Sequence, residues 1–138
     1  MREWMSALVE DVSSWPGVTS HAHRFGGVEF RVGEREIGHV HSFGIVDIPF
    51  TVKIREALIR ARLAEQHHWL PKSGWTTVRV KEHGTTTART LLRFSYLRIV
   101  AKSPEPAGSN QAQSELESFE IEADVLVAAG IQIPAAKA

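Results

Sequence analysis

The sequence predicts an α+β domain in which an antiparallel β-meander packs against helices. Residues 28–32 alternate apolar and polar side chains, as expected of a strand with one buried face. Glycine-containing turns at 25–27 and 33–34 separate this strand from two further short strand-like segments. Segments with helical apolar spacing lie before and after these strands. Short strands that are joined by tight turns pair in antiparallel fashion, and this gives the fold class.

The composition fits one small domain. The chain has 138 residues, of which 43% are hydrophobic, and this is enough for a single core. Its 16 Lys and Arg balance 16 Asp and Glu, whereas nucleic-acid-binding domains usually carry a basic excess that neutralises phosphates. The absence of cysteine excludes disulfides and Cys-ligated metal sites. No apolar run approaches the roughly 18 residues of a membrane-spanning helix. The N-terminus lacks a signal-peptide core, so a cytoplasmic protein without a membrane contact is expected.

The chain is expected to begin with a helix over residues 2–14. Apolar side chains recur there at helical spacing, at Trp4, Leu8, Val9 and Val12. Proline and glycine both break helical continuity, so the segment 15–17 (Trp-Pro-Gly) ends this helix.

Three strands are expected next, at 18–24, 28–32 and 35–42. Alternate residues of a strand share a face, so Ile37, His39 and His41 are expected on one side of the third strand. Residues 44–49 are predicted to form an irregular connector.

The remaining predicted elements are helices at 52–65, 86–101 and 115–129 and a strand at 75–81. Thr51 is the expected cap of the first of these helices. The last helix has a strand as its alternative, because apolar and acidic residues also alternate there. Proline, serine and glycine enrich residues 103–110, a composition typical of linkers. The sequence therefore predicts a main domain over 1–102, a linker over 103–113, and an appended segment over 114–138 with one helix and a frayed end.

Six motifs carry a resemblance to a known family, through their order and spacing together. They are Trp15-Pro16-Gly17-Val18, His21 to Phe30 (HAHRFGGVEF), Glu36 to His41 (EIGHVH), Asp47-Ile48-Pro49-Phe50, His67 to Trp75 (HHWLPKSGW) and Leu91 to Tyr96 (LLRFSY). Over residues 8–100 this pattern resembles the bacterial luciferase-domain family, the stand-alone relatives of fungal luciferase. The layout is more loosely similar to small YjbR/MmcQ-type domains, which implies an antiparallel sheet with helices packed on it.

The resemblance implies a function. Fungal luciferase oxidises a hydroxyhispidin-type pyrone with molecular oxygen and emits light. A related activity would make this chain an oxidase or monooxygenase that acts on an aromatic or pyrone-like substrate with O2 and without an organic cofactor. The alternative is a non-catalytic binding or protein-interaction module. A homodimer is a further expectation, with residues 104–138 as the segment that docks a second copy.

Histidine is the most informative residue type, and it occurs at positions 21, 23, 39, 41, 67, 68 and 83. His21 and His23 are two residues apart on a predicted strand, as are His39 and His41, so each pair projects to one side. If both strands belong to one sheet, four imidazoles share a face. His68 could join them from a neighbouring loop. The predicted catalytic residues are therefore these two pairs and His68.

Three interpretations of the histidines are open. The first is metal-free acid–base chemistry, because imidazole titrates near neutral pH and can take a proton from an enol or phenol. The second is a metal site, because imidazole ligates Zn, Cu, Fe and Ni, and Asp47 or Glu29 could add a carboxylate. Its expected ligands would be His21, His23, His39 and His41. The third is a set of hydrogen-bonded histidines with a structural role only.

Four further residues are candidates for ligand binding, each with a structural alternative. Arg24 could hold a substrate oxyanion or be an ordinary surface arginine. Trp75 could offer its ring to a flat ligand or lie in the core. Glu29 could line the site or form a cross-strand ion pair. Asp47 could hydrogen-bond a histidine and fix its tautomer, or cap the following helix.

Overall fold

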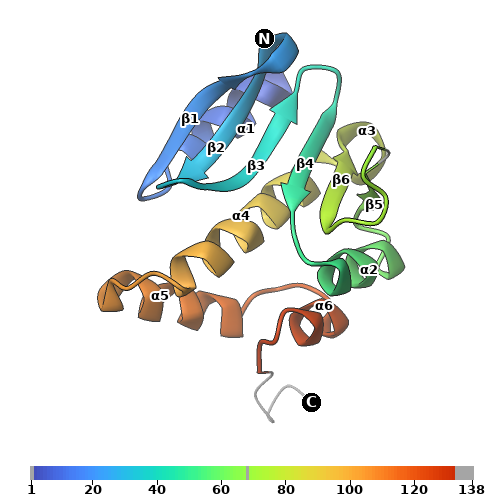
Figure 1. Cartoon of the computed structure of the whole chain (residues 1–138). Helices are drawn as coiled ribbons and strands as arrows, with labels where there is room; N and C mark the ends of the chain where they lie inside the picture. The colour runs from blue at the N-terminus through green and yellow to red at the C-terminus, as the bar shows by residue number, and fades with distance from the viewer. Residues whose placement is uncertain (1, 68, 133–138) are drawn as a thin grey trace.

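A computed structural model describes residues 2–67 and 69–132. Figure 1 shows its elements, which are α1 (Glu3–Ser13), β1 (Val18–His23), the 3-10 turn η1 (Arg24–Gly26), β2 (Gly27–Val32), β3 (Arg35–His41), β4 (Ile45–Pro49), α2 (Val52–Arg60), β5 (Glu65–Gln66), β6 (Trp75–Arg79), α3 (Val80–His83), α4 (Thr85–Ala101), α5 (Pro106–Glu117) and α6 (Ala123–Ala128).

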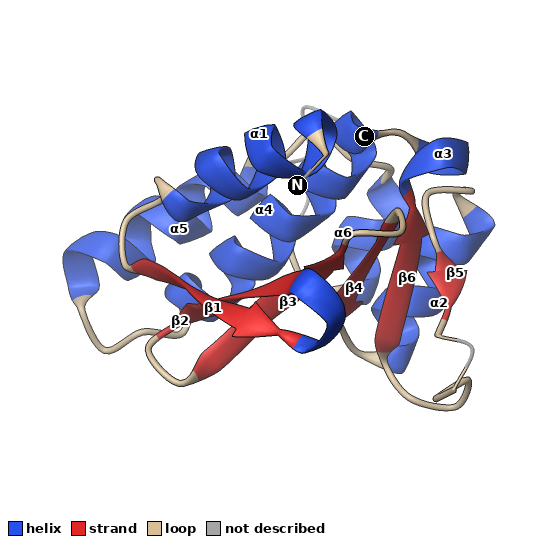
Figure 2. Cartoon of the chain, turned by 90° about the horizontal axis from the view of Figure 1, so that it is seen from above, coloured by secondary structure: helices blue, strands red, loops and turns tan. Residues whose placement is uncertain are grey.

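The strands form one sheet in the order β1-β2-β3-β4-β6-β5, and every neighbouring pair is antiparallel. Helices α1, α4 and α5 lie on one side of this sheet (Figure 2). No α-helix among residues 2–67 and 69–132 covers the opposite face of β1 to β4 (Figure 2). The predicted α+β fold, a meander with helices packed on it, is confirmed. Within the same part of the chain, no helix is long and apolar enough to span a membrane.

The hydrophobic core lies between the sheet and α4. Phe30 of β2 is fully buried there, as are Leu91, Leu92 and Phe94 of α4. Gly38 of β3 allows the helix to approach closely. A Cβ atom on Gly38 would lie 2.7 Å from a side-chain carbon of Leu92, closer than such atoms pack. The absence of a side chain at this position therefore brings α4 against the sheet.

A β-bulge interrupts the regular alternation of β3. Phe30 pairs with Gly38, but the next residue of β2, Arg31, pairs with Glu36. Ile37 is therefore an extra residue on β3. A bulge of this kind bends the strand and redirects the side chains on one side of it.

The bulge changes which side chains of β3 share a face. Ile37 is fully buried in the core, and its carbonyl accepts a hydrogen bond of 2.8 Å from the Ser95 hydroxyl. The prediction that Ile37 lies beside His39 and His41 is therefore wrong. Glu36 lies on the histidine side instead, because the extra residue reverses the alternation.

Two further elements differ from the sequence prediction in the middle of the chain. Residues 45–49, predicted as a connector, form β4 between β3 and β6. Its unbroken buried run is typical of a central strand. Helix α2 ends at Arg60 because Arg62 adopts a left-handed conformation with φ 62°. The Leu63 N–H then bonds the Leu58 carbonyl, which is the Schellman arrangement that ends a helix.

The C-terminal segment is more ordered than its composition predicts. Residues 106–117 form α5, which begins at Pro106, because proline favours the first helical position. Residues 106–113, predicted as part of a linker over 103–113, are therefore helical. The single helix predicted at 115–129 is the end of α5 followed by α6. Helices α5 and α6 pack against α4 and α2. Their apolar side chains join the main core through Ala112, Leu116, Val125 and Leu126. A frayed end was predicted over 131–138. Ile131 is buried in the core and its N–H bonds the Leu126 carbonyl, whereas residues 133–138 lie outside the described residues.

Candidate functional site

The candidate site lies on the helix-free face of the sheet, where polar side chains form a row across neighbouring strands. The register pairs His21 with Glu29, Glu29 with His39, His39 with Asp47, and Asp47 with Thr77. Directly paired residues of antiparallel strands project to the same face. The topology thus gathers side chains that are far apart in the sequence.

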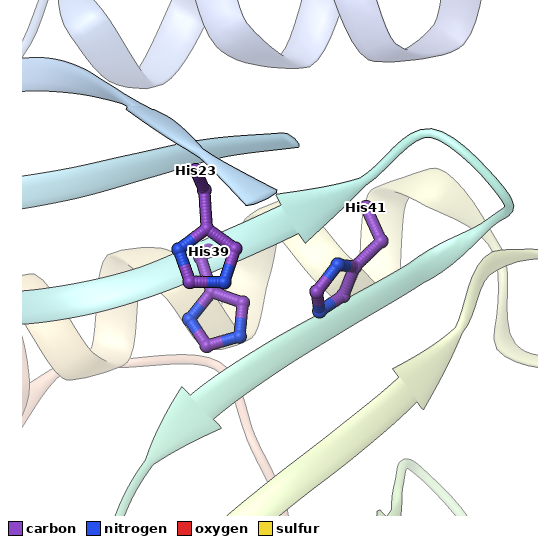
Figure 3. Close-up of side chains that lie close together, drawn as sticks. All are labelled: His23, His39 and His41. Carbon is purple, nitrogen blue, oxygen red and sulfur yellow. The ribbon is translucent and has the colours of Figure 1, made fainter. Parts of the chain in front are cut away.

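Three imidazoles form the centre of the site, which we call the His cluster: His23, His39 and His41. The rings of His23 and His39 stack, with centroids 4.2 Å apart and planes 20° apart (Figure 3). The His41 ring meets the His39 ring edge to face, at 4.9 Å and 86°. One nitrogen of each ring lies within 4.8 Å of one nitrogen of the others. Gly27, the partner of His23 on β2, has no side chain that would separate these rings.

Asp47 of β4 is the buried carboxylate that imidazoles surround. Its Oδ2 atom lies 3.0 Å from His41 Nε2, 3.4 Å from His39 Nε2 and 3.6 Å from His67 Nε2. The Thr77 hydroxyl donates a hydrogen bond of 2.7 Å to Oδ1. Asp47 is only 3% exposed, and a charge buried to this degree requires partners. The surrounding imidazoles and hydroxyl supply them.

Two glutamates hold the outer nitrogens of the stacked rings. Glu36 Oε2 lies 2.6 Å from His39 Nδ1, and Glu29 Oε1 lies 3.4 Å from His23 Nδ1. Glu29 also accepts a hydrogen bond of 2.5 Å from Nε of Arg31. A carboxylate at Nδ1 fixes the orientation of an imidazole and directs its Nε2 atom. The glutamates therefore position the rings.

The carboxylates set the protonation of the cluster. Burial is the largest single influence on the His39 pKa and lowers it, but hydrogen bonds to Asp47 and Glu36 outweigh burial and raise the pKa to about 9. Burial and the charge of His39 lower the pKa of His41, although Asp47 opposes them. Burial would raise the pKa of Asp47, but its hydrogen bonds with His39 and Thr77 lower it. At neutral pH the carboxylate therefore lies between a protonated and a neutral imidazole.

A cleft of about 810 Å³ adjoins the His cluster. It is lined by His23, Arg24, Phe25, His39, His41, Phe43, Ile45, Asp47, His67, Trp69, Leu70, Trp75 and Arg79. Four of the six exposed large hydrophobic side chains among the described residues line it, namely Phe25, Phe43, Trp69 and Leu70. Exposed apolar side chains gathered around a concave surface mark a binding site more often than they mark chance exposure.

Two aromatic side chains show how the cleft is built. Phe25 is 85% exposed and has φ 57°, a left-handed conformation that is costly for a bulky residue. Phe25 belongs to η1, the turn that bounds the cleft next to His23. The Trp75 ring lies 5.4 Å from the His39 ring and is partly buried. Trp75 thus belongs to the cleft rather than to the core.

The structure separates the predicted site residues into two groups. His23, His39, His41 and Asp47 come together, with Arg24 and Trp75 on the same cleft and Glu29 behind His23. His21 does not join them, because it is exposed and hydrogen-bonded to the Thr19 hydroxyl at 2.8 Å. His68 lies outside the described residues.

Two residues that contact the site, Glu36 and His67, were not among the predicted site residues. Glu36 was not predicted to face the histidines, because the bulge that redirects its side chain leaves no clear signal in the sequence. His67 belongs to neither predicted histidine pair, yet its Nε2 atom lies 3.6 Å from Asp47 Oδ2. The alternative that Asp47 caps α2 is wrong, because Thr51 fills that position and its hydroxyl accepts the Ile54 N–H at 3.2 Å.

One comparison with known proteins identifies a similar family. Residues 34–95 match the family model of the luciferase domain. The matched segment is similar to the luciferase domain and spans a little less than half of the 138 residues. The match confirms the predicted resemblance, and the luciferase domain includes His39, His41 and Asp47, whereas His23 lies before the matched segment. No curated protein and no solved structure gives a significant match to the chain.

Proposed function

We propose that the cleft binds a flat aromatic or pyrone-like molecule with an acidic hydroxyl group and promotes its oxidation by O2. One observation carries the proposal: the aromatic cleft adjoins an imidazole–carboxylate group of which His39, His41 and Asp47 lie in the segment that matches the luciferase domain. The family match favours a luciferase-like function. The reaction class, the substrate class, the use of O2 and the assignment of the cleft as the site are all part of the proposal.

The side chains of the cleft suit such a ligand. Trp75 and Phe43 offer ring faces for stacking on a flat molecule. Arg24 and Arg79 add positive charge that favours a bound oxyanion. Arg79 forms an ion pair with Glu65 at 3.2 Å, whereas Arg24 has no carboxylate partner within the described part of the chain. Arg24 is therefore the expected anchor of the oxyanion.

Binding as the oxyanion prepares the ligand for oxidation. An imidazole of the His cluster accepts the hydroxyl proton, and the resulting enolate or phenolate is electron-rich at a ring carbon. That carbon forms a bond to O2, and the electron pair of the oxyanion moves into the ring system as a carbonyl forms. The resulting peroxide anion takes up one proton. Dioxygen is reduced and the substrate is oxidised, so the step needs no further reductant.

A turnover experiment tests this proposal. Purified protein is mixed with a hydroxyhispidin-type pyrone in aerated and in oxygen-free buffer, while pyrone absorbance and light emission are recorded. We expect pyrone loss in aerated buffer only. The double variant His39→Ala/His41→Ala should lose this activity, and His21→Ala, an exposed histidine outside the cleft, should retain it. Circular dichroism checks that each variant is folded. Pyrone loss that is the same with and without the protein would overturn the proposal.

A non-catalytic binding module is the second candidate. The exposed side chains of Phe25 and Trp69 favour it, because interaction surfaces also present such residues. Saturable binding of the pyrone without loss of pyrone or O2 would support this alternative. In that case the His39→Ala/His41→Ala variant should weaken binding without any accompanying change in oxygen concentration.

A further inference from the structure

The arrangement of three atoms around the Asp47 carboxylate is specific. His39 Nε2 and His41 Nε2 lie 3.4 Å and 3.0 Å from Asp47 Oδ2. Two ligand atoms that are each about 2.1 Å from one metal ion lie about 3.0–3.4 Å apart when the angle between them is about 90–109°. The two observed separations therefore have the values that ligands of a shared ion would have.

The ring orientations agree with this geometry. The planes of His39 and His41 are 86° apart. An ion that displaces the His39 proton would therefore meet the in-plane lone pairs of two differently oriented rings. His23 does not satisfy this condition. Its ring stacks on His39 with planes only 20° apart, so it cannot aim a lone pair at an ion held in the plane of the His39 ring (Figure 3). The ligand set therefore excludes His23, although its nitrogen is near.

Hydrogen bonding accounts for only one of the imidazole contacts at Asp47 Oδ2. His41 Nε2 lies at hydrogen-bond distance, 3.0 Å from this oxygen. His39 Nε2 lies 3.4 Å away, which is longer than an ordinary N–H···O bond. An ion between the carboxylate and these two imidazoles would give His39 Nε2 a bonded partner on this side as well.

Outer contacts orient two of the three groups as they do in metal sites. Glu36 holds His39 Nδ1 at 2.6 Å, and the Thr77 hydroxyl holds Asp47 Oδ1 at 2.7 Å. Metal-bound histidines almost always give their second nitrogen to such a partner, often a carboxylate. Glu36 and Asp47 also supply negative charge near a divalent cation.

From these contacts we infer that His39, His41 and Asp47 bind a divalent first-row transition-metal ion at the base of the cleft. Two imidazoles and one carboxylate on one side of an ion leave its other positions open, which is the ligand set of non-haem Fe(II) oxygenases. Bound Fe²⁺ would supply contact with O2 and with a substrate oxyanion. The inference deepens the proposed function by naming the ion, and metal binding itself is measurable without any substrate.

Cobalt binding tests the site directly. Chelator-treated protein without an affinity tag is titrated with Co²⁺ in oxygen-free buffer, and the visible d–d absorption is followed. We expect one ion per chain. His39→Ala and His41→Ala should each weaken binding by about 100-fold or more, and Glu36→Gln, which keeps every ligand, by about 10-fold. His21→Ala is the matched control and should bind as the unaltered chain does.

Each result has a defined meaning. Absence of a one-to-one complex in the unaltered chain would overturn the metal site. So would equal affinity in His39→Ala and His21→Ala, both shown to be folded by circular dichroism. If the alanine variants do not fold, Asp47→Asn and Glu36→Gln make the same comparison. Pyrone oxidation at the full rate by metal-free protein would overturn a role of the ion in the reaction and leave the proposed function intact. Stoichiometric cobalt binding by a chain that does not oxidise the pyrone, with or without Fe²⁺, would support the metal site and overturn the proposed function.

Discussion

Glu36 lies 2.6 Å from His39 Nδ1, although strict alternation along β3 would place these two side chains on opposite faces. The bulge at Ile37 brings them together. One extra residue thus turns an apolar side chain into the core and a carboxylate toward the site. The position of the bulge is therefore a determinant of the His cluster as well as of the sheet.

The Ser95 hydroxyl should stabilise this bulge. It donates to the buried Ile37 carbonyl from α4. Ser95→Ala leaves that carbonyl without its partner, and we expect the free energy of unfolding to fall by about 1–2 kcal/mol. Urea denaturation measures the change. Ser118→Ala removes an exposed hydroxyl from the end of α5 and should change it by less than about 0.5 kcal/mol. Equal values for the two variants would contradict the role of Ser95.

Close packing of α4 on β3 should make Gly38 irreplaceable. An alanine Cβ would lie 2.7 Å from a Leu92 side-chain carbon and 2.9 Å from the Asp47 carbonyl oxygen. Gly38→Ala should therefore destabilise the fold by about 1–3 kcal/mol. Gly108→Ala, in helix α5 with 3.9 Å to its nearest neighbour, should instead stabilise by about 0.5–1 kcal/mol. Thermal unfolding of both variants checks the opposite signs, and a shared sign would refute the packing argument.

The left-handed conformation of Phe25 should lower the stability of the fold while its exposed ring favours ligand binding. Asparagine tolerates this conformation, and the Phe25 ring is too exposed to add much packing. Phe25→Asn should raise stability by about 0.5–1 kcal/mol and weaken binding of a flat ligand. Arg62, at φ 62° and outside the cleft, provides the control. Arg62→Asn should stabilise similarly without any effect on binding. Calorimetric titration with the pyrone in oxygen-free buffer distinguishes the two variants.

The contact between α4 and α5 should depend on pH through Glu115. Its two hydrogen bonds from Arg93, each 2.8 Å, hold the pKa of Glu115 below its ordinary value of 4.5, although burial opposes the shift. A lowered folded-state pKa gives stability that is present above pH 4.5 and is lost as the pH falls through the folded-state pKa.

Glu115→Gln should therefore lower the free energy of unfolding at pH 7 by about 0.5–1 kcal/mol, a modest value because the carboxylate is partly exposed. The difference from the unaltered chain should shrink as the pH falls below about 4.5. Glu117→Gln, on the same helix but without an ion pair in the described structure, should show little effect at any pH. A difference that stays constant down to low pH would contradict the assignment.

Local signals predicted much of this fold, and non-local contacts account for the rest. Glycine turns and alternation identified β1, β2 and β3 because each signal acts within a few residues. β4 was missed because a strand buried on both faces does not alternate. The end of α2 depends on Arg62 in a conformation that sequence rarely signals outside glycine and asparagine. Composition did not predict helix α5, because this helix is stabilised by packing on α4.

The part of the site that could be predicted is the part in which the spacing of residues along a strand determines the face to which their side chains project. The pairs His21/His23 and His39/His41 were each expected on one face, and the topology then selected His23, His39 and His41. His21 was lost because β1 lies at the edge of the sheet, where its side chain meets solvent. Asp47 and His67 reach the cluster through strand pairing and a loop, and neither contact leaves a periodic signal in the sequence.

Oxygen uptake with the pyrone tests the central claim most directly. An oxygen electrode records uptake as a hydroxyhispidin-type pyrone is added to the unaltered chain, to His41→Ala and to His21→Ala. We predict one O2 consumed per pyrone by the unaltered chain and by His21→Ala, and only the background rate with His41→Ala. Background uptake in all three samples, or equal uptake in all three, would contradict the claim that the His cluster acts on such a substrate.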